Sequence, residues 1–132
     1  KHNIIYAVAG EGKVGFVDAE DIGRVAATAL TTHGHSGKFY EITGPELLSY
    51  SDAANVISEV IGKTIVYPNP TAEQFSQTLA QAGAPAFIAD YMIDVYSLIA
   101  NNRVNRITSV VENVTGRKPT SLKEVIKRDF SK

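Results

Sequence analysis

One segment of the sequence, residues 85–102, constrains the fold more than any other. It reads PAFIADYMIDVYSLIANN and predicts a helix of about five turns, with Pro85 in its first turn. Its polar residues follow the spacing i, i+4, i+7, i+11 on one narrow stripe: Asp90, Asp94, Ser97 and Asn101. Since the rest is apolar, this helix must be covered on more than one side. It is therefore a central core helix, the wall of a ligand pocket or part of an interface.

Other helices are predicted from apolar spacing and from residues that cap helix ends. The helix after Asp18 has one apolar face, for which we expect burial: Ile22, Val25, Ala26, Ala29 and Leu30. Three pairs have the spacing of a capping box and predict helix starts: Ser49 with Asp52, Thr71 with Gln74, and Ser121 with Glu124. A further small helix is predicted within 107–116, so that we expect about five helices in all.

Short β-type runs alternate with these helices. They are residues 4–8, 14–17, 38–43 and 64–68. Alternation of this kind predicts an α/β fold with a few short strands. We expect strands 14–17 and 38–42 to be parallel, because a helix of crossover length joins them.

The stretch GEGKVG at residues 10–15 matches G-x-G-x-x-G, the phosphate-binding pattern of dinucleotide-binding folds. That chemistry requires the glycines to follow a strand and to open a helix whose N-terminus faces the pyrophosphate. Here Gly15 is followed by FVD, a β-type run, and the helical pattern begins only near Ala19. We therefore interpret GEGKVG as a turn in which glycines supply positive φ angles.

Composition limits the class of protein. At 132 residues with 44% hydrophobic residues, the chain has the size and apolar content of one domain, 1–132. Its net charge of −1 gives no basic excess for binding nucleic acid. The chain has no cysteine, no apolar run approaching the roughly 20 residues of a membrane span, and no signal-peptide pattern. We expect a cytoplasmic protein. Because the sequence does not begin with methionine, we also expect a processed or truncated piece of a longer chain.

Catalytic and metal-binding patterns are weak. His33 and His35 lie in a glycine-rich turn without carboxylates at ligand spacing, so we predict no metal site. No serine lies in G-x-S-x-G, and no tyrosine is followed by lysine four residues later. We therefore predict no catalytic residue within this chain.

The order of the segments resembles a known family. GKVGFVDAEDIGRVAATAL, HSGKFYEITGPELLSYSDAANVISEVIGK, the AGAP break and GRKPTSLKEVIK are similar to the C-terminal half of NmrA-like atypical short-chain dehydrogenase/reductase proteins. The quinone oxidoreductase and triphenylmethane reductase branch is the most similar. The resemblance covers nearly the whole chain, and its most specific part runs from Val17 to Gly62.

This resemblance implies the C-terminal portion of a Rossmann-like fold, whose N-terminal half holds NADP(H) and whose C-terminal half covers the substrate. The family's glycine fingerprint has no counterpart here, so the cofactor is expected in the parent protein and not on this segment alone. The implied function is reduction of quinones or similar flat, apolar acceptors. The alternative is an NmrA-type regulator that senses NAD(P) and acts through a protein partner without turnover.

Aromatic residues are the candidates for contacting a flat acceptor, because rings supply apolar area and stacking. We select Phe75, Phe87, Tyr91 and Tyr96. The partners we expect are the missing N-terminal Rossmann half, a small apolar substrate and a second copy of the chain. For self-association the contact residues expected are Phe87, Tyr91 and Tyr96, because open strand edges and apolar faces are normally covered.

Overall fold

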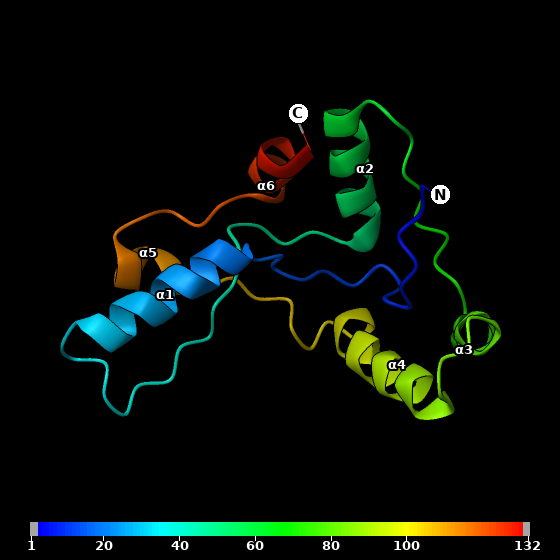
Figure 1. Ribbon diagram of the computed structural model, residues 1–132, viewed down its shortest axis with the longest axis horizontal. Helices are drawn as coiled ribbons and strands as arrows, with labels where there is room; N and C mark the ends of the chain where they lie inside the picture. Colours follow the sequence, from blue (N-terminus) through cyan, green and yellow to red (C-terminus); the bar gives the residue numbers. More distant parts are fainter. Residues whose placement is uncertain (1–2, 131–132) are drawn as a thin grey trace.

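The computed structural model describes residues 3–130, which form six helices joined by extended segments (Figure 1). The helices pack in three pairs, α1 with α5, α2 with α6 and α3 with α4. Their bounds are α1 Ala19–Thr31, α2 Tyr50–Ile61, α3 Ala72–Gln81, α4 Ala86–Ala100, α5 Val110–Thr115 and α6 Leu122–Phe130. Each predicted helix is therefore present, with ends shifted by up to three residues.

The helix starts form as the capping residues predict. Ser49 Oγ accepts from the amide of Asp52 (3.0 Å) while the Asp52 carboxylate accepts from the amide of Ser49 (2.9 Å). Thr71 and Gln74 make the same reciprocal pair at the start of α3. Asp18 caps α1 by accepting from the amide of Glu20 (3.1 Å). These bonds satisfy amides that a helix leaves unpaired in its first turn.

The expected strands do not form. Within residues 3–130 there is no regular strand, only two isolated bridges, Ile4 with Val66 (parallel) and Val14 with Leu48 (antiparallel). Segments 14–17 and 38–42 do not pair, which corrects the expected parallel arrangement. No backbone amide of residues 39–42 bonds to the backbone of another described residue. A β-type run becomes a strand only when a neighbour supplies a ladder, and segment 38–43 has none in this part of the chain.

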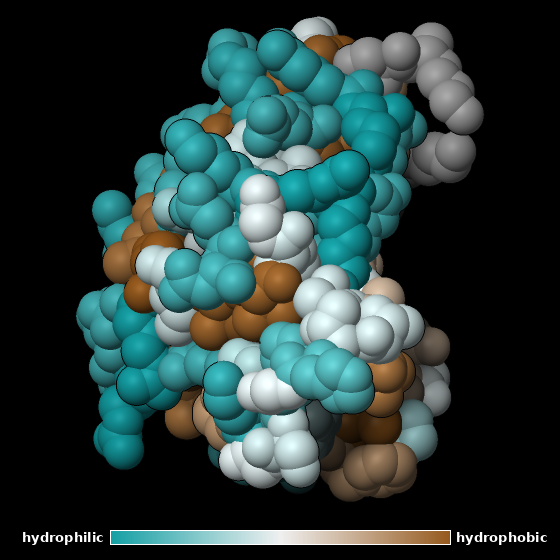
Figure 2. All heavy atoms as spheres, turned by 90° about the vertical axis from the view of Figure 1, so that its left-hand side faces the viewer, coloured by the Kyte–Doolittle hydropathy of each residue, from teal (hydrophilic) through white to brown (hydrophobic). Residues whose placement is uncertain are grey.

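The apolar face of α1 is also less buried than its spacing predicts. Val25 is buried on α1, which packs on α5, but Ile22 is exposed and Leu30 is 87% exposed. Phe39, in the unpaired segment that follows α1, is 89% exposed. The space-filling view of this end of the molecule shows hydrophobic residues at the surface among hydrophilic ones (Figure 2). The amphipathic pattern is real, but the described residues provide nothing to cover it.

The core is small and lies where the helix pairs meet the extended segments. Its buried apolar residues include Phe75, Val111 and Ile126, together with alanines of segment 4–9, α2 and α4. The longest helix described, α4, has 15 residues, and no helix in residues 3–130 has the length and apolar content needed to span a membrane.

Candidate functional site

Six aromatic rings touch one another where α2, α3 and α4 meet the extended segments, and we call them the aromatic cluster. Its members are Tyr6, Phe16, Tyr50, Tyr67, Phe75 and Tyr96. Tyr50 is central: its ring centroid lies 5.3 Å from that of Phe16, 5.7 Å from Tyr67 and 5.9 Å from Tyr96. Such edge-to-face and tilted contacts are favourable beyond the area they bury.

Burial, followed by the neighbouring Tyr96 and Tyr67, raises the pKa of Tyr50 to about 12. Tyr50 is therefore a neutral phenol throughout the physiological range. The hydroxyl of Tyr67 accepts from the amide of Ala9 (3.1 Å) and lies within hydrogen-bonding distance of Gly10 O (3.2 Å). The cluster thus offers apolar ring surface with phenolic hydroxyls, and it fixes the chain entering the GEGKVG turn.

The four aromatic residues selected from the sequence divide between two faces of the molecule. Phe75 is buried, stacks on Tyr6 and meets Tyr96 edge-on at 6.0 Å. Phe87 and Tyr91 are each 67% exposed on α4. Nine residues at 100° per residue place Tyr96 on the side of α4 opposite Phe87. One flat ligand cannot contact both pairs, so the structure brings together Phe75 and Tyr96 only.

GEGKVG forms a turn, as predicted, but each of its three glycines is required for a different reason. Gly10 has a positive φ of 55°, and the amide of Gly12 donates to Ala9 O (3.2 Å). At Gly12 an added Cβ would lie 1.8 Å from the carbonyl oxygen of Ile99. At Gly15 it would lie 3.0 Å from Ile107 Cδ1. Only Gly10 uses a positive φ, so the expectation that glycines here supply positive φ holds for that one position.

This turn does not fit a dinucleotide phosphate. The amide of Gly12 is already bonded within the turn, and its Cα is packed against the C-terminal end of α4. The next helix begins at Ala19, so no helix N-terminus opens from the glycines. Residues 10–15 therefore have the spacing of a phosphate cradle without its geometry.

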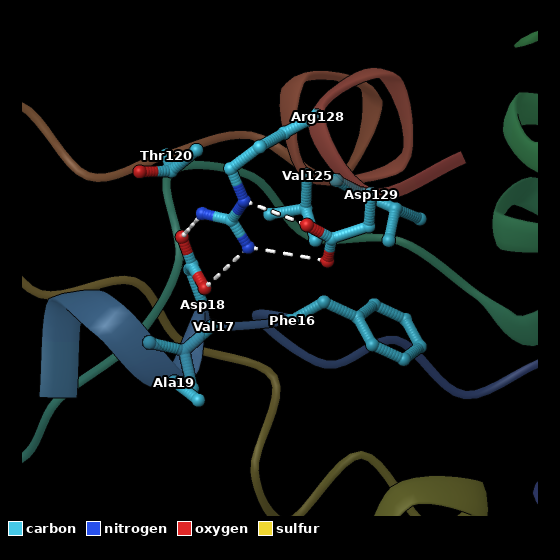
Figure 3. A pocket seen from close by; sticks show the side chains of 9 residues that line it. Phe16, Val17, Asp18, Ala19, Thr120, Val125, Arg128 and Asp129 are labelled. Atoms are coloured by element: carbon cyan, nitrogen blue, oxygen red, sulfur yellow. Dashed lines mark hydrogen bonds and ion pairs between the residues drawn. The ribbon is translucent and has the colours of Figure 1, made fainter. Parts of the chain in front are cut away.

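A small pocket of about 260 Å³ lies between the start of α1 and helix α6 (Figure 3). Its apolar walls include Phe16, Leu122 and Val125, and Phe16 also belongs to the aromatic cluster. On its polar side, Arg128 donates to the Asp18 carboxylate (2.7 and 3.3 Å) and to the Asp129 carboxylate. Since two carboxylates already pair with the guanidinium, Arg128 is not available as an anion site.

Asp18 and Asp21 have a role that the sequence analysis missed. Both are buried, and besides starting α1 they hold the C-terminal segment. Asp18 pairs with Arg128 of α6, and Asp21 accepts from the amide of Thr120 (2.6 Å) and from Arg24 (2.7 Å). The Arg128 guanidinium holds the pKa of Asp18 below its usual range. No local signal pairs residues about 100 positions apart, so these contacts were not predictable from spacing.

The histidine turn has local partners. His35 Nε2 lies 2.8 Å from Thr32 Oγ1, and Nδ1 lies 2.7 Å from the Tyr40 hydroxyl. Among the residues that the structure describes, no group of three His, Cys, Asp or Glu is placed to hold a metal ion. His35 thus closes the turn after α1.

Comparison with known proteins relates the chain to oxidoreductases. It is 37% identical over 122 residues to the NAD(P)H azoreductase of Xenophilus azovorans, covering 92% of this chain and 43% of that protein. The triphenylmethane reductase of Citrobacter sp., solved with NADP(H), superposes with a TM-score of 0.83 at 28% identity, covering 96% of this chain and 44% of that chain. The NADPH-dependent quinone oxidoreductase of Escherichia coli, solved with NADPH, gives 0.86 at 24% identity, covering 96% and 45%.

No protein-family model matches the chain. The chain spans less than half the length of the curated relatives that it matches. The likeness to the quinone oxidoreductase is one of fold, whereas the azoreductase and triphenylmethane reductase also share sequence. Over more than nine-tenths of its length, the chain is homologous to the C-terminal portion of NmrA-like atypical short-chain dehydrogenase/reductase proteins, which include NAD(P)H-dependent oxidoreductases.

Proposed function

We propose that this chain is the acceptor-binding portion of an NAD(P)H-dependent oxidoreductase that reduces quinones or similar flat, apolar compounds. The observation that carries the proposal is the match to an NAD(P)H azoreductase along 92% of the chain. A ring cluster with neutral phenols suits such an acceptor, because flat apolar molecules gain from stacking and a phenol adds one polar contact.

We further propose that NADP(H) is held by an N-terminal Rossmann half that packs against α1 and segment 38–43. The exposed side chains of Ile22, Leu30 and Phe39 support this, as do the amides of 39–42 that lack backbone partners. A strand of a parallel sheet would pair that backbone, and the sheet face would cover the apolar side of α1. The misfit of GEGKVG is consistent with a cofactor bound elsewhere.

For the acceptor we favour the Tyr96 side of α4. Tyr96 and Tyr50 are half-buried, so their rings have surface available, while Phe75 is buried behind Tyr96 and supports its position. Phe75 and Tyr96 therefore remain candidates for one acceptor site, the first as support and the second as direct contact.

The test uses the longer protein that contains these 132 residues. NADPH oxidation is followed with menadione and with an azo dye as acceptors. Tyr96→Leu should raise KM for menadione and leave KM for NADPH unchanged, whereas Tyr91→Leu, on the opposite face of the same helix, should change neither. Saturable NADP(H) binding without turnover of any acceptor, together with retention of a protein partner, would favour the regulatory alternative instead.

A further inference from the structure

The backbone of segment 39–42 has one edge that is already occupied. The carbonyl of Glu41 accepts from the Thr108 hydroxyl (2.6 Å), and the amide of Thr108 donates in return to the Thr43 hydroxyl (2.9 Å). The Glu41 carboxylate also pairs with Arg106. The loop that precedes α5 therefore closes this edge, through one hydroxyl and one ion pair.

The other edge of the same segment is open. In an extended strand, the amide and carbonyl of one residue point to one edge, and those of the next residue point to the opposite edge. Since the Glu41 carbonyl faces Thr108, the amides and carbonyls of Tyr40 and Ile42 face away from it. None of these four groups has a hydrogen-bond partner among residues 3–130. A row of unpaired backbone groups is a template for another strand.

We propose that residues 39–42 form the terminal strand of the parallel sheet of the longer protein, and that they pair through Tyr40 and Ile42 with a strand of its N-terminal half. This pairing rests on the N-terminal Rossmann half proposed above, and it adds which backbone groups pair and where the sheet ends. A further strand could join on the Glu41 side only by displacing Thr108 and Arg106, because loops and charged side chains protect sheet edges in this way.

Two observations favour a parallel strand of the N-terminal half as the occupant. In the relatives, the matched C-terminal portion follows more than half of the protein, so a large part of the parent lies outside these residues. Helix α1 directly precedes the segment, and Leu30 at its end and Phe39 are 87% and 89% exposed. A helix in this position covers a face of a parallel sheet, which would bury such side chains.

A second copy of the chain fits the open edge less well. Two copies related by a two-fold axis pair antiparallel. The register that sets Tyr40 of one copy against Ile42 of the other also sets Glu41 directly opposite Glu41, and like charges at such positions are destabilising.

The first test is residue-resolved hydrogen exchange by NMR, on the 132-residue chain and on the longer protein. In the longer protein, the amides of Tyr40 and Ile42 should exchange at least about 100-fold more slowly than in the chain, because they gain hydrogen bonds. The amides of Phe39 and Glu41 should change by less than about tenfold, since they face the closed edge. Equal protection of all four amides, protection of Phe39 and Glu41 alone, or no protection would each overturn the pairing.

The second test compares proline with alanine at one position, so that the loss of the side chain cancels. Ile42→Pro removes an amide of the open edge, and should lower the melting temperature of the longer protein by at least about 5 °C more than Ile42→Ala. Glu41→Pro should match Glu41→Ala within about 2 °C, because proline is tolerated where the N–H of an edge strand faces away from the sheet. Equal or reversed differences would overturn the pairing. If Ile42→Pro does not fold, hydrogen exchange of the unsubstituted protein still decides.

Acceptor reduction, measured on the same preparations, separates this pairing from the proposed function. Slow exchange at Tyr40 and Ile42 in a protein that reduces no quinone or azo dye supports the pairing and contradicts the reductase function. Turnover of menadione with free exchange at both amides supports the function and overturns the pairing. Protection that appears in the 132-residue chain as its concentration rises would assign the open edge to a second copy, and would also overturn the proposal.

Discussion

Substituting Gly12 by alanine should destabilise the chain strongly, through a contact that sequence spacing does not reveal. The added Cβ would lie 1.8 Å from Ile99 O, 2.4 Å from Ile99 C and 2.9 Å from Ala100 N. Ordinary van der Waals contact to such atoms begins at about 3.4 Å. The turn and the C-terminal end of α4 must therefore separate by roughly 1.5 Å. No side-chain rotation relieves the clash, because all three atoms belong to the backbone.

The expected cost is about 2–4 kcal/mol, at or slightly above the usual range for overpacking. Gly12 does not have a positive φ, so alanine adds no backbone strain and even removes some freedom from the unfolded chain. The whole loss is therefore steric. For a domain of this size, about 1 kcal/mol corresponds to roughly 3–6 °C, so thermal unfolding should shift down by about 6 °C or more.

Two other glycines serve as controls in the same melting experiment. Gly10→Ala meets only Ala100 Cβ at 3.7 Å but retains a φ of 55°, so it should cost about 1–2 kcal/mol from backbone strain alone. Gly23→Ala lies inside α1 with nothing within 4 Å, and should stabilise by about 0.5–1 kcal/mol. A Gly12→Ala protein that melts at or above the Gly10→Ala protein would refute the close-approach argument.

Three further predictions concern ionisable groups. The pKa of Asp18 is lowered chiefly by its hydrogen bond from Arg128, so this pair stabilises the fold at neutral pH. The urea midpoint of unfolding should therefore fall as the pH drops below about 4, and this fall should be smaller in the Asp18→Asn variant. The pKa of Tyr50 is raised to about 12, so its stabilisation is lost as the pH rises from 10 towards 12; Tyr50→Phe should remove the latest-titrating phenol from an absorbance titration. Asp21→Ala leaves two donors unpaired and should cost about 1–3 kcal/mol, while Glu20→Gln, at an exposed ion pair, should cost at most about 0.5 kcal/mol in the same melts.

Local signals in the sequence predicted the helices well. Capping residues such as Ser49 and Thr71 act on amides two or three positions away, so their effect is readable from spacing alone. The homology was also predictable, because the order of the segments along nearly the whole chain resembles the family, and the match covers 92% of the chain. The strands were predicted wrongly for the opposite reason: residues 38–43 have strand-type side chains, but a ladder depends on a neighbour, which the described residues do not provide.

The candidate site was only partly predictable. Choosing aromatic residues found Phe75 and Tyr96, which lie together, but also Phe87 and Tyr91, which face away from them. A helix whose polar residues form only one narrow stripe leaves open which of its apolar sides turns inward, so periodicity cannot sort these residues. The central position of Tyr50 was missed because its neighbours come from elements far apart in the sequence.

The GEGKVG turn packs against the C-terminal end of the apolar helix α4. The end of α4 lies against Gly12 so closely that a methyl group cannot fit, while Ala100 approaches Gly10. Tyr67 binds the chain at Ala9, and Tyr96 on α4 joins the same aromatic cluster through Tyr50. The inner side of α4 is therefore fixed by backbone contact at its C-terminal end and by the ring contacts of Tyr96. Gly12 thus allows the end of α4 to approach the turn, and Gly10 supplies its positive φ, so the glycine spacing of residues 10–15 carries no phosphate chemistry here.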